Sequence, residues 1–260
     1  MAIKRGQRRP PKETDYILPL EVKPIKTGSE GGVLGYSVRA PSEARRKGLH
    51  GYIGTPDGIP KSRKINPANQ IIEITRELQK HGIHTPKITR RNNEQLTYED
   101  AGKNIGEVIS GLSRPNISKL NRNKVKQRIK KLLSAFARQL GEMHAAKYSH
   151  GHIASRNVTV KGSKVSIIDL KYAKKQNVDW TSTSSIFNAF IADYEHLINY
   201  RTLHFLTNGI GPRETFKFLK RMVSRYPASE QIKRRVFAEI LHHFEGISPE
   251  PAIEYWNKIL

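Results

Sequence analysis

The sequence predicts an α+β protein, with short strands in its N-terminal part and helices through most of the remainder. Between residues 16 and 40, two apolar runs flank a glycine-rich stretch, which is typical of a strand–turn–strand unit. From residue 118 to 147, apolar residues recur every three or four positions, the spacing of a helix that packs one face on a core. Further helices are expected over 186–206, 212–223, 229–244 and 249–260.

Composition restricts the class of protein. The chain has 260 residues, of which 37% are hydrophobic and 27% charged, enough for one large or two modest domains. No run of 18 apolar residues is present, and the basic N-terminus lacks the apolar segment of a secretory signal. The absence of cysteine excludes disulfides, thiolate metal sites and a cysteine nucleophile. We therefore expect a cytoplasmic protein without a membrane span.

The chain is strongly basic. Its formal net charge is +23, with 46 Lys and Arg against 23 Asp and Glu. Such a charge predicts affinity for polyanions, which include RNA, DNA, an acidic protein or a membrane surface, without distinguishing between them. A generally basic proteome is the alternative explanation. Residues 1–14 are expected to form a flexible basic arm.

The glycine-rich stretch lies between expected strands at Tyr16–Leu20 and Val33–Val38. Its glycines Gly28, Gly31 and Gly32 allow backbone amides to approach phosphate groups closely. Hairpin turns use the same residues, so a simple turn is the alternative.

A helix is expected over residues 67–82, because Pro67 suits a first turn and His81-Gly82 is a usual stop signal. It carries two acidic residues, Glu73 and Glu77. A strand is expected to begin within Ile83–Ile88. A second apolar strand, Leu96–Tyr98, runs into Glu99-Asp100-Ala101.

The helix expected over 118–147 has two different halves. Its apolar stripe consists of Val125, Ile129, Leu132, Phe136, Leu140 and Met143, and we assign it to the core. Its first half is basic, with Lys119, Arg122, Lys124, Lys126, Arg128, Lys130 and Lys131. This basic half is either a solvated face or a polyanion-binding surface.

Two polar residues lie on either side of an expected hairpin. Asn157 precedes the first short strand, and Asp169 follows the second, Val165–Ile168. A carboxylate and an amide oxygen are hard ligands that suit magnesium. Asn and Asp also favour turns, which is the alternative explanation for each residue alone. His152 lies five residues before Asn157.

The stretch 148–170 resembles the protein-kinase-like superfamily. The helix expected over 67–82, followed by the Gly-Ile-X-X-Pro segment at 82–86, resembles small atypical kinases of that superfamily, such as the RIO and lipopolysaccharide kinases. The resemblance covers roughly residues 16–205. It implies a bilobal fold, with a β-rich N-lobe containing one helix (15–102) and a larger helical C-lobe (103–260). It also implies that ATP binds with Mg²⁺ held by Asn157 and Asp169, and that His152 occupies the position of the catalytic Asp. Asp193 corresponds to a buried Asp that braces the catalytic loop.

The resemblance further implies a strand lysine paired with a helix glutamate. Lys61 and Glu73 are the candidates, with Lys47 and Lys64 as rivals for the lysine and Glu77 as a rival for the glutamate. The backbone of the segment containing Glu99 and Ala101 corresponds to the hinge that holds adenine in the family.

Two main functions follow from these motifs. The first is an atypical phosphotransferase that moves the γ-phosphate of ATP to a hydroxyl acceptor oriented by His152. The second is a pseudokinase that acts as a nucleic-acid- or protein-binding scaffold, because His152 lacks the fixed charge of an Asp. A third, more remote alternative is a nucleic-acid-binding helical protein that resembles a kinase by accident.

Overall fold

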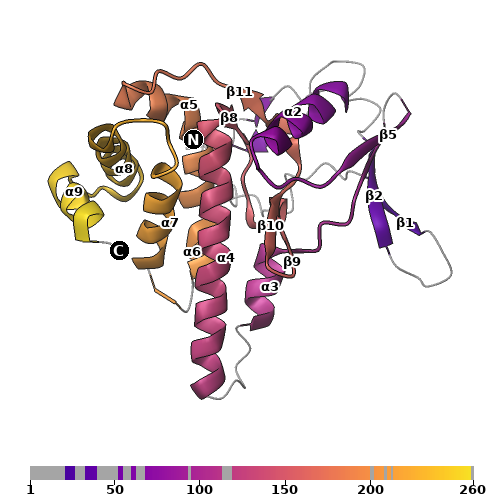
Figure 1. Cartoon of the computed structure of the whole chain (residues 1–260), viewed down its shortest axis with the longest axis horizontal. Coiled ribbons are helices and arrows are strands. Elements are labelled where there is room, and N and C mark those ends of the chain that lie inside the picture. Colours follow the sequence, from indigo (N-terminus) through magenta and orange to yellow (C-terminus); the bar gives the residue numbers. More distant parts are fainter. Residues whose placement is uncertain are drawn as a thin grey trace, which may run out of the picture.

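The computed structural model describes residues 21–26, 33–39, 52–54, 60–62, 68–92, 95–112, 119–199, 202–207, 210–211 and 213–258. Within these ranges, helices and small antiparallel sheets are mixed and helix predominates, which confirms the α+β class (Figure 1). The described helices are α2 (Ala68–Lys80), α3 (Ile105–Leu112), α4 (Lys119–Ala145), α5 (Thr183–Ile198), α6 (Thr202–Thr207), α7 (Arg213–Val223), α8 (Glu230–Glu245) and α9 (Pro249–Lys258). Two single 3-10 turns are η2 (Ser155–Asn157) and η3 (Leu170–Tyr172).

The largest described sheet has four antiparallel strands in the order β1-β2-β6-β5. Its strands are β1 (Glu21–Lys26), β2 (Val33–Arg39), β5 (Ile88–Asn92) and β6 (Gln95–Tyr98). A three-stranded sheet in the order β10-β9-β7 contains β7 (Lys103–Asn104), β9 (Val158–Lys161) and β10 (Lys164–Ile167). The remaining pairs are β3 (Tyr52–Gly54) with β4 (Pro60–Ser62), and β8 (Tyr148–Ser149) with β11 (Lys174–Lys175).

Some expectations lie outside the described residues. These are the basic arm at 1–14, the strand at 16–20, and the glycine-rich turn with Gly28, Gly31 and Gly32. The strands on either side of that turn, β1 and β2, pair with each other in an antiparallel hairpin.

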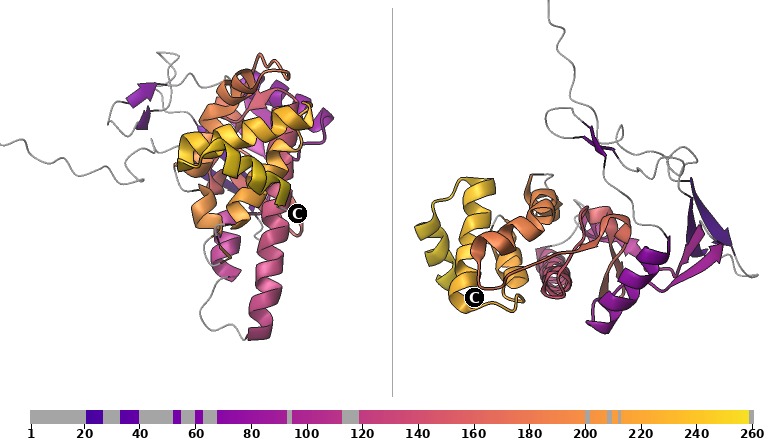
Figure 2. Two further views of the ribbon diagram at one scale, coloured as in Figure 1. Left: turned by 90° about the vertical axis from the view of Figure 1, so that its left-hand side faces the viewer. Right: turned by 90° about the horizontal axis from the view of Figure 1, so that it is seen from above.

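Helix α4 runs through the middle of the molecule (Figures 1 and 2). The four-stranded sheet and α2 lie on one side of it, and α5 to α9 lie on the other. Its predicted apolar stripe is buried: Ile129, Leu132, Phe136, Leu140 and Met143 are each at most 4% exposed, and Val125 is half-buried. The assignment of this stripe to the core is therefore confirmed.

Most helix predictions agree with the structure within a few residues, but the helix expected over 186–206 is wrong as a single element. The chain forms α5 and then α6 instead. In a continuous helix, Leu203 and Leu206 would point away from the face that carries Phe190 and Leu197. Because α5 ends before residue 200, Leu203 and Leu206 lie in a separate helix, and all four side chains are buried. Helix α3 was not expected from the sequence, although its Ile105 and Ile109 are buried.

Local capping signals also appear where the sequence placed helix ends. The Ser229 hydroxyl accepts a hydrogen bond from the Ile232 amide at the start of α8, and Gly246 ends this helix with a φ of 66°. Among the helices of the described ranges, none combines the length and the apolar character that a membrane crossing requires.

Candidate functional site

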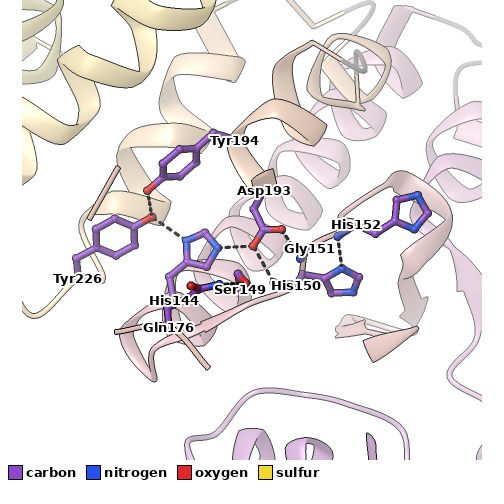
Figure 3. Close-up of polar contacts among 9 residues, drawn as sticks. All are labelled: His144, Ser149, His150, Gly151, His152, Gln176, Asp193, Tyr194 and Tyr226. Atoms are coloured by element: carbon purple, nitrogen blue, oxygen red, sulfur yellow. Dashed lines mark hydrogen bonds and ion pairs between the residues drawn. The ribbon is translucent and has the colours of Figure 1, made fainter. Parts of the chain in front are cut away.

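A buried carboxylate fixes the loop between β8 and η2. Asp193, in α5, is fully buried and accepts hydrogen bonds from two consecutive backbone amides, His150 (2.8 Å) and Gly151 (2.7 Å) (Figure 3). Gly151 has a φ of 74°, and a Cβ there would lie 2.8 Å from the Tyr172 carbonyl oxygen. The bracing of this loop by Asp193, which the sequence resemblance implied, is therefore present.

A chain of hydrogen bonds supports Asp193 from behind. His144 Nε2 lies 3.0 Å from Asp193 Oδ2, and His144 Nδ1 lies 2.8 Å from the Tyr226 hydroxyl, which contacts the Tyr194 hydroxyl at 2.9 Å (Figure 3). Burial pushes the pKa of Asp193 up, but the hydrogen bonds and charges of His144 and His150 outweigh it and hold the pKa below its usual value. Because the ionised carboxylate only accepts, His144 donates from Nε2.

The His150 side chain joins this loop to the strand that leads to Asp169. Its Nε2 lies 2.8 Å from the Ile168 carbonyl oxygen and donates to it. Its Nδ1 then accepts from the His152 amide at 3.3 Å. The His150 side chain thus orients the backbone on both sides of the site.

Asn157 is 4% exposed and lies at the end of η2. Its backbone oxygen accepts a hydrogen bond from the Ile168 amide (2.9 Å), which holds Asn157 beside the residue that precedes Asp169. Its side-chain Nδ2 donates to the His152 carbonyl oxygen at 2.8 Å. Because the nitrogen is used in this way, Oδ1 is the atom that the amide can offer to a cation.

Asp169 adopts a left-handed backbone with a φ of 62°, a region that Asp and Asn tolerate better than most residues. Its Oδ2 lies 2.8 Å from the Lys171 ammonium, and the Lys171 side chain is only 17% exposed. The hairpin of β9 and β10, in which Ile167 pairs with Val158, brings Asn157 and Asp169 to the same end of the two strands.

His152 has a strongly perturbed environment. Burial, together with the nearby charges of His196, Arg156, His150 and Lys171, lowers the pKa of His152 to about 2. Both ring nitrogens face N–H donors, since Nε2 lies 3.3 Å from Arg156 Nη2 and Nδ1 lies 3.5 Å from Asn157 Nδ2. The imidazole is therefore neutral and cannot replace the negative charge of a carboxylate.

The expected lysine–glutamate pair includes Lys61, whose side chain lies outside the part of the chain whose side chains are described. Lys61 lies in β4, which pairs with β3 in a two-stranded sheet. Glu73 is exposed on α2, on a surface that also includes Tyr148 and Lys175.

The segment with Glu99 and Ala101 connects the two larger sheets. The Glu99 amide donates to the Lys87 carbonyl oxygen (2.9 Å). The Lys161 ammonium of the β9–β10 hairpin lies 3.3 Å from the Asp100 carbonyl oxygen. This segment therefore passes directly from β6 to the hairpin that carries Asn157.

The predicted basic residues of α4 differ in their surroundings. Arg122, Lys124, Lys126, Arg128 and Lys131 are exposed. Lys130 is half-buried and lies 3.5 Å from Glu214. The Lys119 side chain lies outside the part of the chain whose side chains are described.

Several residues around the site were missed from the sequence. Lys171 could have been found, because it lies two residues after Asp169. His196, whose ring centroid is 5.0 Å from that of His152, had no local signal. The same is true of His144 and Tyr226, which contact each other across 82 residues of sequence.

A magnesium ion fits the donors of Asn157 and Asp169, which are both hard oxygens. In the described parts of the chain, no group of three or more His, Asp and Glu side chains could hold a metal ion by itself. A two-ligand site matches a magnesium ion that takes its remaining ligands from phosphates and water.

Comparisons with known proteins do not identify a family. No protein-family model matches the chain, and no curated protein matches it. Among solved structures, a match is "WaaP in complex with acyl carrier protein", with 18% sequence identity and a TM-score of 0.49 over 91% of this chain and 89% of that chain. A likeness at this level does not establish membership of a family.

Proposed function

We propose that this chain is an atypical, kinase-like ATP-binding protein whose Asn157 and Asp169 hold Mg²⁺ with the nucleotide. The observation that carries the proposal is the hydrogen bond from the Ile168 amide to the Asn157 carbonyl oxygen (2.9 Å), which keeps the two oxygen-bearing side chains at one end of the hairpin. The Asp193 carboxylate adds support. It accepts two short hydrogen bonds from the loop that precedes Asn157, and so fixes that loop.

When magnesium is bound with ATP, it neutralises part of the negative charge of the phosphates. The chain contributes the Asp169 carboxylate and the Asn157 amide oxygen. The further nucleotide contacts of the proposal are those that the sequence resemblance implies, namely Gly28, Gly31, Gly32, Lys61, Glu73, Glu99 and Ala101.

His152 limits what such a site does chemically. A pKa of about 2 makes this imidazole a weak base, so it orients an acceptor hydroxyl through a ring nitrogen and does not remove its proton before transfer. Phosphoryl transfer depends mainly on positioning and charge stabilisation, so slow transfer of the γ-phosphate to a hydroxyl remains chemically reasonable.

A pseudokinase is the second candidate, and the surroundings of His152 favour it. The Arg156 guanidinium lies 3.3 Å from His152 Nε2, where a kinase requires an acceptor for the substrate hydroxyl. In this case ATP is a structural ligand, and the protein acts as a scaffold for nucleic acid or another protein.

Nucleotide binding is tested by calorimetric titration of nucleic-acid-free protein with ATP and Mg²⁺. Asp169→Asn is the most informative variant, because Asn tolerates the left-handed backbone and only the charge is lost. Asp179→Asn is the matched control, since Asp179 is exposed and lies outside this site. Magnesium-dependent binding that Asp169→Asn loses and Asp179→Asn keeps would support the proposal. Absence of binding by the unaltered protein would refute it.

Phosphate transfer is tested separately, by measuring ADP formation and labelling of the protein from γ-labelled ATP. His152→Ala is compared with His204→Ala, a histidine exposed on α6. Transfer that only His152→Ala loses identifies an enzyme. ATP binding without transfer by the unaltered protein identifies a pseudokinase.

A further inference from the structure

The first half of α4 extends beyond the elements that pack on its second half. Helix α7 meets α4 from Lys130, which lies 3.5 Å from Glu214, to Gly141, where a Cβ would lie 2.4 Å from the Met222 carbonyl oxygen. The turns before residue 130 therefore precede the start of α7. The ribbon of α4 extends past α3 and α7 at this end in Figure 1, and the left view of Figure 2 agrees.

Burial of side chains stabilises these projecting turns only slightly. From residue 121 to 128, every side chain is exposed except the half-buried Val125. The sequence from 119 to 141 contains no Asp or Glu. Lys124 and Arg128 are like charges four residues apart, which destabilises a helix, and cations near a helix N-terminus oppose its dipole. A polyanion that contacts the side chains would remove this repulsion.

The side chains divide the projecting turns into three strips. With 3.6 residues per turn, Asn123 and Gln127 lie one turn apart on the side opposite the core-facing stripe that begins with Val125. Lys126 lies on one flank of these amides. Lys124, Arg128 and Lys131 lie on the other flank. These three cations share one surface with the two amides. All the side chains of these three strips are exposed, so they form a ridge of amides between cations.

We propose that this ridge, residues 121–131 of α4, binds in the major groove of duplex DNA. An α-helix is about 10–12 Å in diameter, which matches a groove about 12 Å wide. The flanking cations then face the phosphates on both sides of the groove, and Asn123 and Gln127 face the base edges. Asn and Gln are the side chains that pair with adenine through two hydrogen bonds.

The same features disfavour other nucleic acids. The major groove of A-form RNA is too deep and narrow to be read by side chains. Single strands are held by stacking on aromatic rings, whereas the sequence from 119 to 135 contains none. The ridge therefore fits duplex DNA best.

The phosphate contacts are tested by fluorescence anisotropy with a short duplex DNA of mixed sequence, at salt concentrations from about 50 to 200 mM. The ridge variant combines Lys124→Gln, Arg128→Gln and Lys131→Gln. The control combines Lys164→Gln, Lys174→Gln and Arg235→Gln, three exposed residues outside α4 with the same total charge. This control matters because the whole chain is basic.

Each lost phosphate contact lowers the dependence of log Kd on log salt by about 0.9, so the slope is expected to fall by about 2 to 3 in the ridge variant and little in the control. Equal effects of the two triple variants would overturn the proposal, since binding would then reflect the net charge alone. The fold of each variant is checked by circular dichroism.

The base-edge contacts are tested by selecting preferred sequences from a randomised duplex pool. Asn123→Ala with Gln127→Ala should keep the salt slope and lose the sequence preference, because phosphate contacts carry no sequence information. Tighter binding of duplex RNA or single-stranded DNA through the same residues would overturn the groove assignment. Asp169→Asn should leave DNA binding unchanged, so this proposal and the ATP-binding proposal fail independently.

Discussion

The Lys171 ammonium lies 2.8 Å from the Asp169 carboxylate, two residues away in sequence and on the same 3-10 turn. The ion pair is partly shielded, since the two side chains are 17% and 28% exposed. Asp169 is the residue proposed to hold magnesium. The lysine therefore competes with a metal ion for the same carboxylate, and it also adds a positive charge where ATP phosphates are expected.

Replacement of Lys171 by Ala is expected to strengthen Mg²⁺ binding in the presence of ATP. A partly exposed ion pair contributes up to about 1 kcal/mol, so the apparent magnesium affinity should rise by about fivefold. ATP binding without metal should weaken, because one cation near the phosphates is lost. Calorimetric titrations of ATP at several magnesium concentrations measure both effects.

Lys174→Ala is the control for this prediction. Lys174 is exposed on the neighbouring β11, and its replacement removes the same charge. An identical change in both variants would mean that general electrostatics, and not competition at Asp169, determines the affinity.

Substitution of Asp193 by Asn is expected to destabilise the fold by about 3 to 5 kcal/mol, the usual effect of breaking a buried charged network. The amide would turn an N–H group toward the His150 or Gly151 amide, both of which donate to Asp193. Urea unfolding measures the loss, and hydrogen exchange should show faster exchange at these two amides. Asp179→Asn, on the surface, should change neither observable appreciably. A small loss in the Asp193 variant would mean that the loop is held by other contacts.

Elements encoded by local patterns were predictable. The buried stripe of α4 repeats at helical spacing, and the β9–β10 hairpin turns at Gly162, which has a φ of 65°. By contrast, the break between α5 and α6 depends on which core surface Leu203 reaches. Every residue around it is compatible with a continuous helix, so only tertiary packing determines the break.

The candidate site was predictable in part for the same reason. Asn157 and Asp169 lie on either side of one hairpin, so sequence spacing alone brings them together. His144 comes from α4, Asp193 from α5 and Tyr226 from the turn after α7, and their contacts span 49 and 82 residues. No local pattern connects such residues, and only the resemblance singled out Asp193.

The depressed pKa of His152 makes stability depend on pH. The unfolded histidine titrates near its usual pKa of about 6.5, whereas in the folded protein burial and neighbouring cations lower the pKa to about 2. Between these values the unfolded state binds more protons, so stability from this residue is full above about pH 6.5 and falls as the pH decreases toward 2. The slope is at most about 1.4 kcal/mol per pH unit.

His152→Asn is expected to remove this part of the pH dependence. Urea unfolding of the variant between about pH 4 and 7 should give a flatter curve than that of the unaltered protein. His204→Asn changes an exposed histidine and should leave the slope close to that of the unaltered protein. Parallel curves for the His152 variant and the unaltered protein would show that His152 takes up its proton in the folded state.

Gly102 controls how closely the segment after β6 approaches the hairpin. It has a φ of 92°, and a Cβ there would lie 2.2 Å from the Val160 carbonyl oxygen in β9. Gly102→Ala is therefore expected to cost about 2 kcal/mol or more, through strain and displacement of β7 from β9. Gly162→Ala isolates the strain, because Gly162 has a φ of 65° but nothing lies within 4 Å of its added Cβ. It should cost about 1 to 2 kcal/mol.

The difference between the two alanine variants in urea unfolding measures the close contact alone. Because β9 begins next to Asn157, displacement of β7 should also weaken binding of ATP with Mg²⁺ in Gly102→Ala but not in Gly162→Ala. Equal losses of stability in both variants would mean that the β6–β7 segment moves away from Val160 without cost. Unchanged ATP affinity in Gly102→Ala would separate this segment from the nucleotide site.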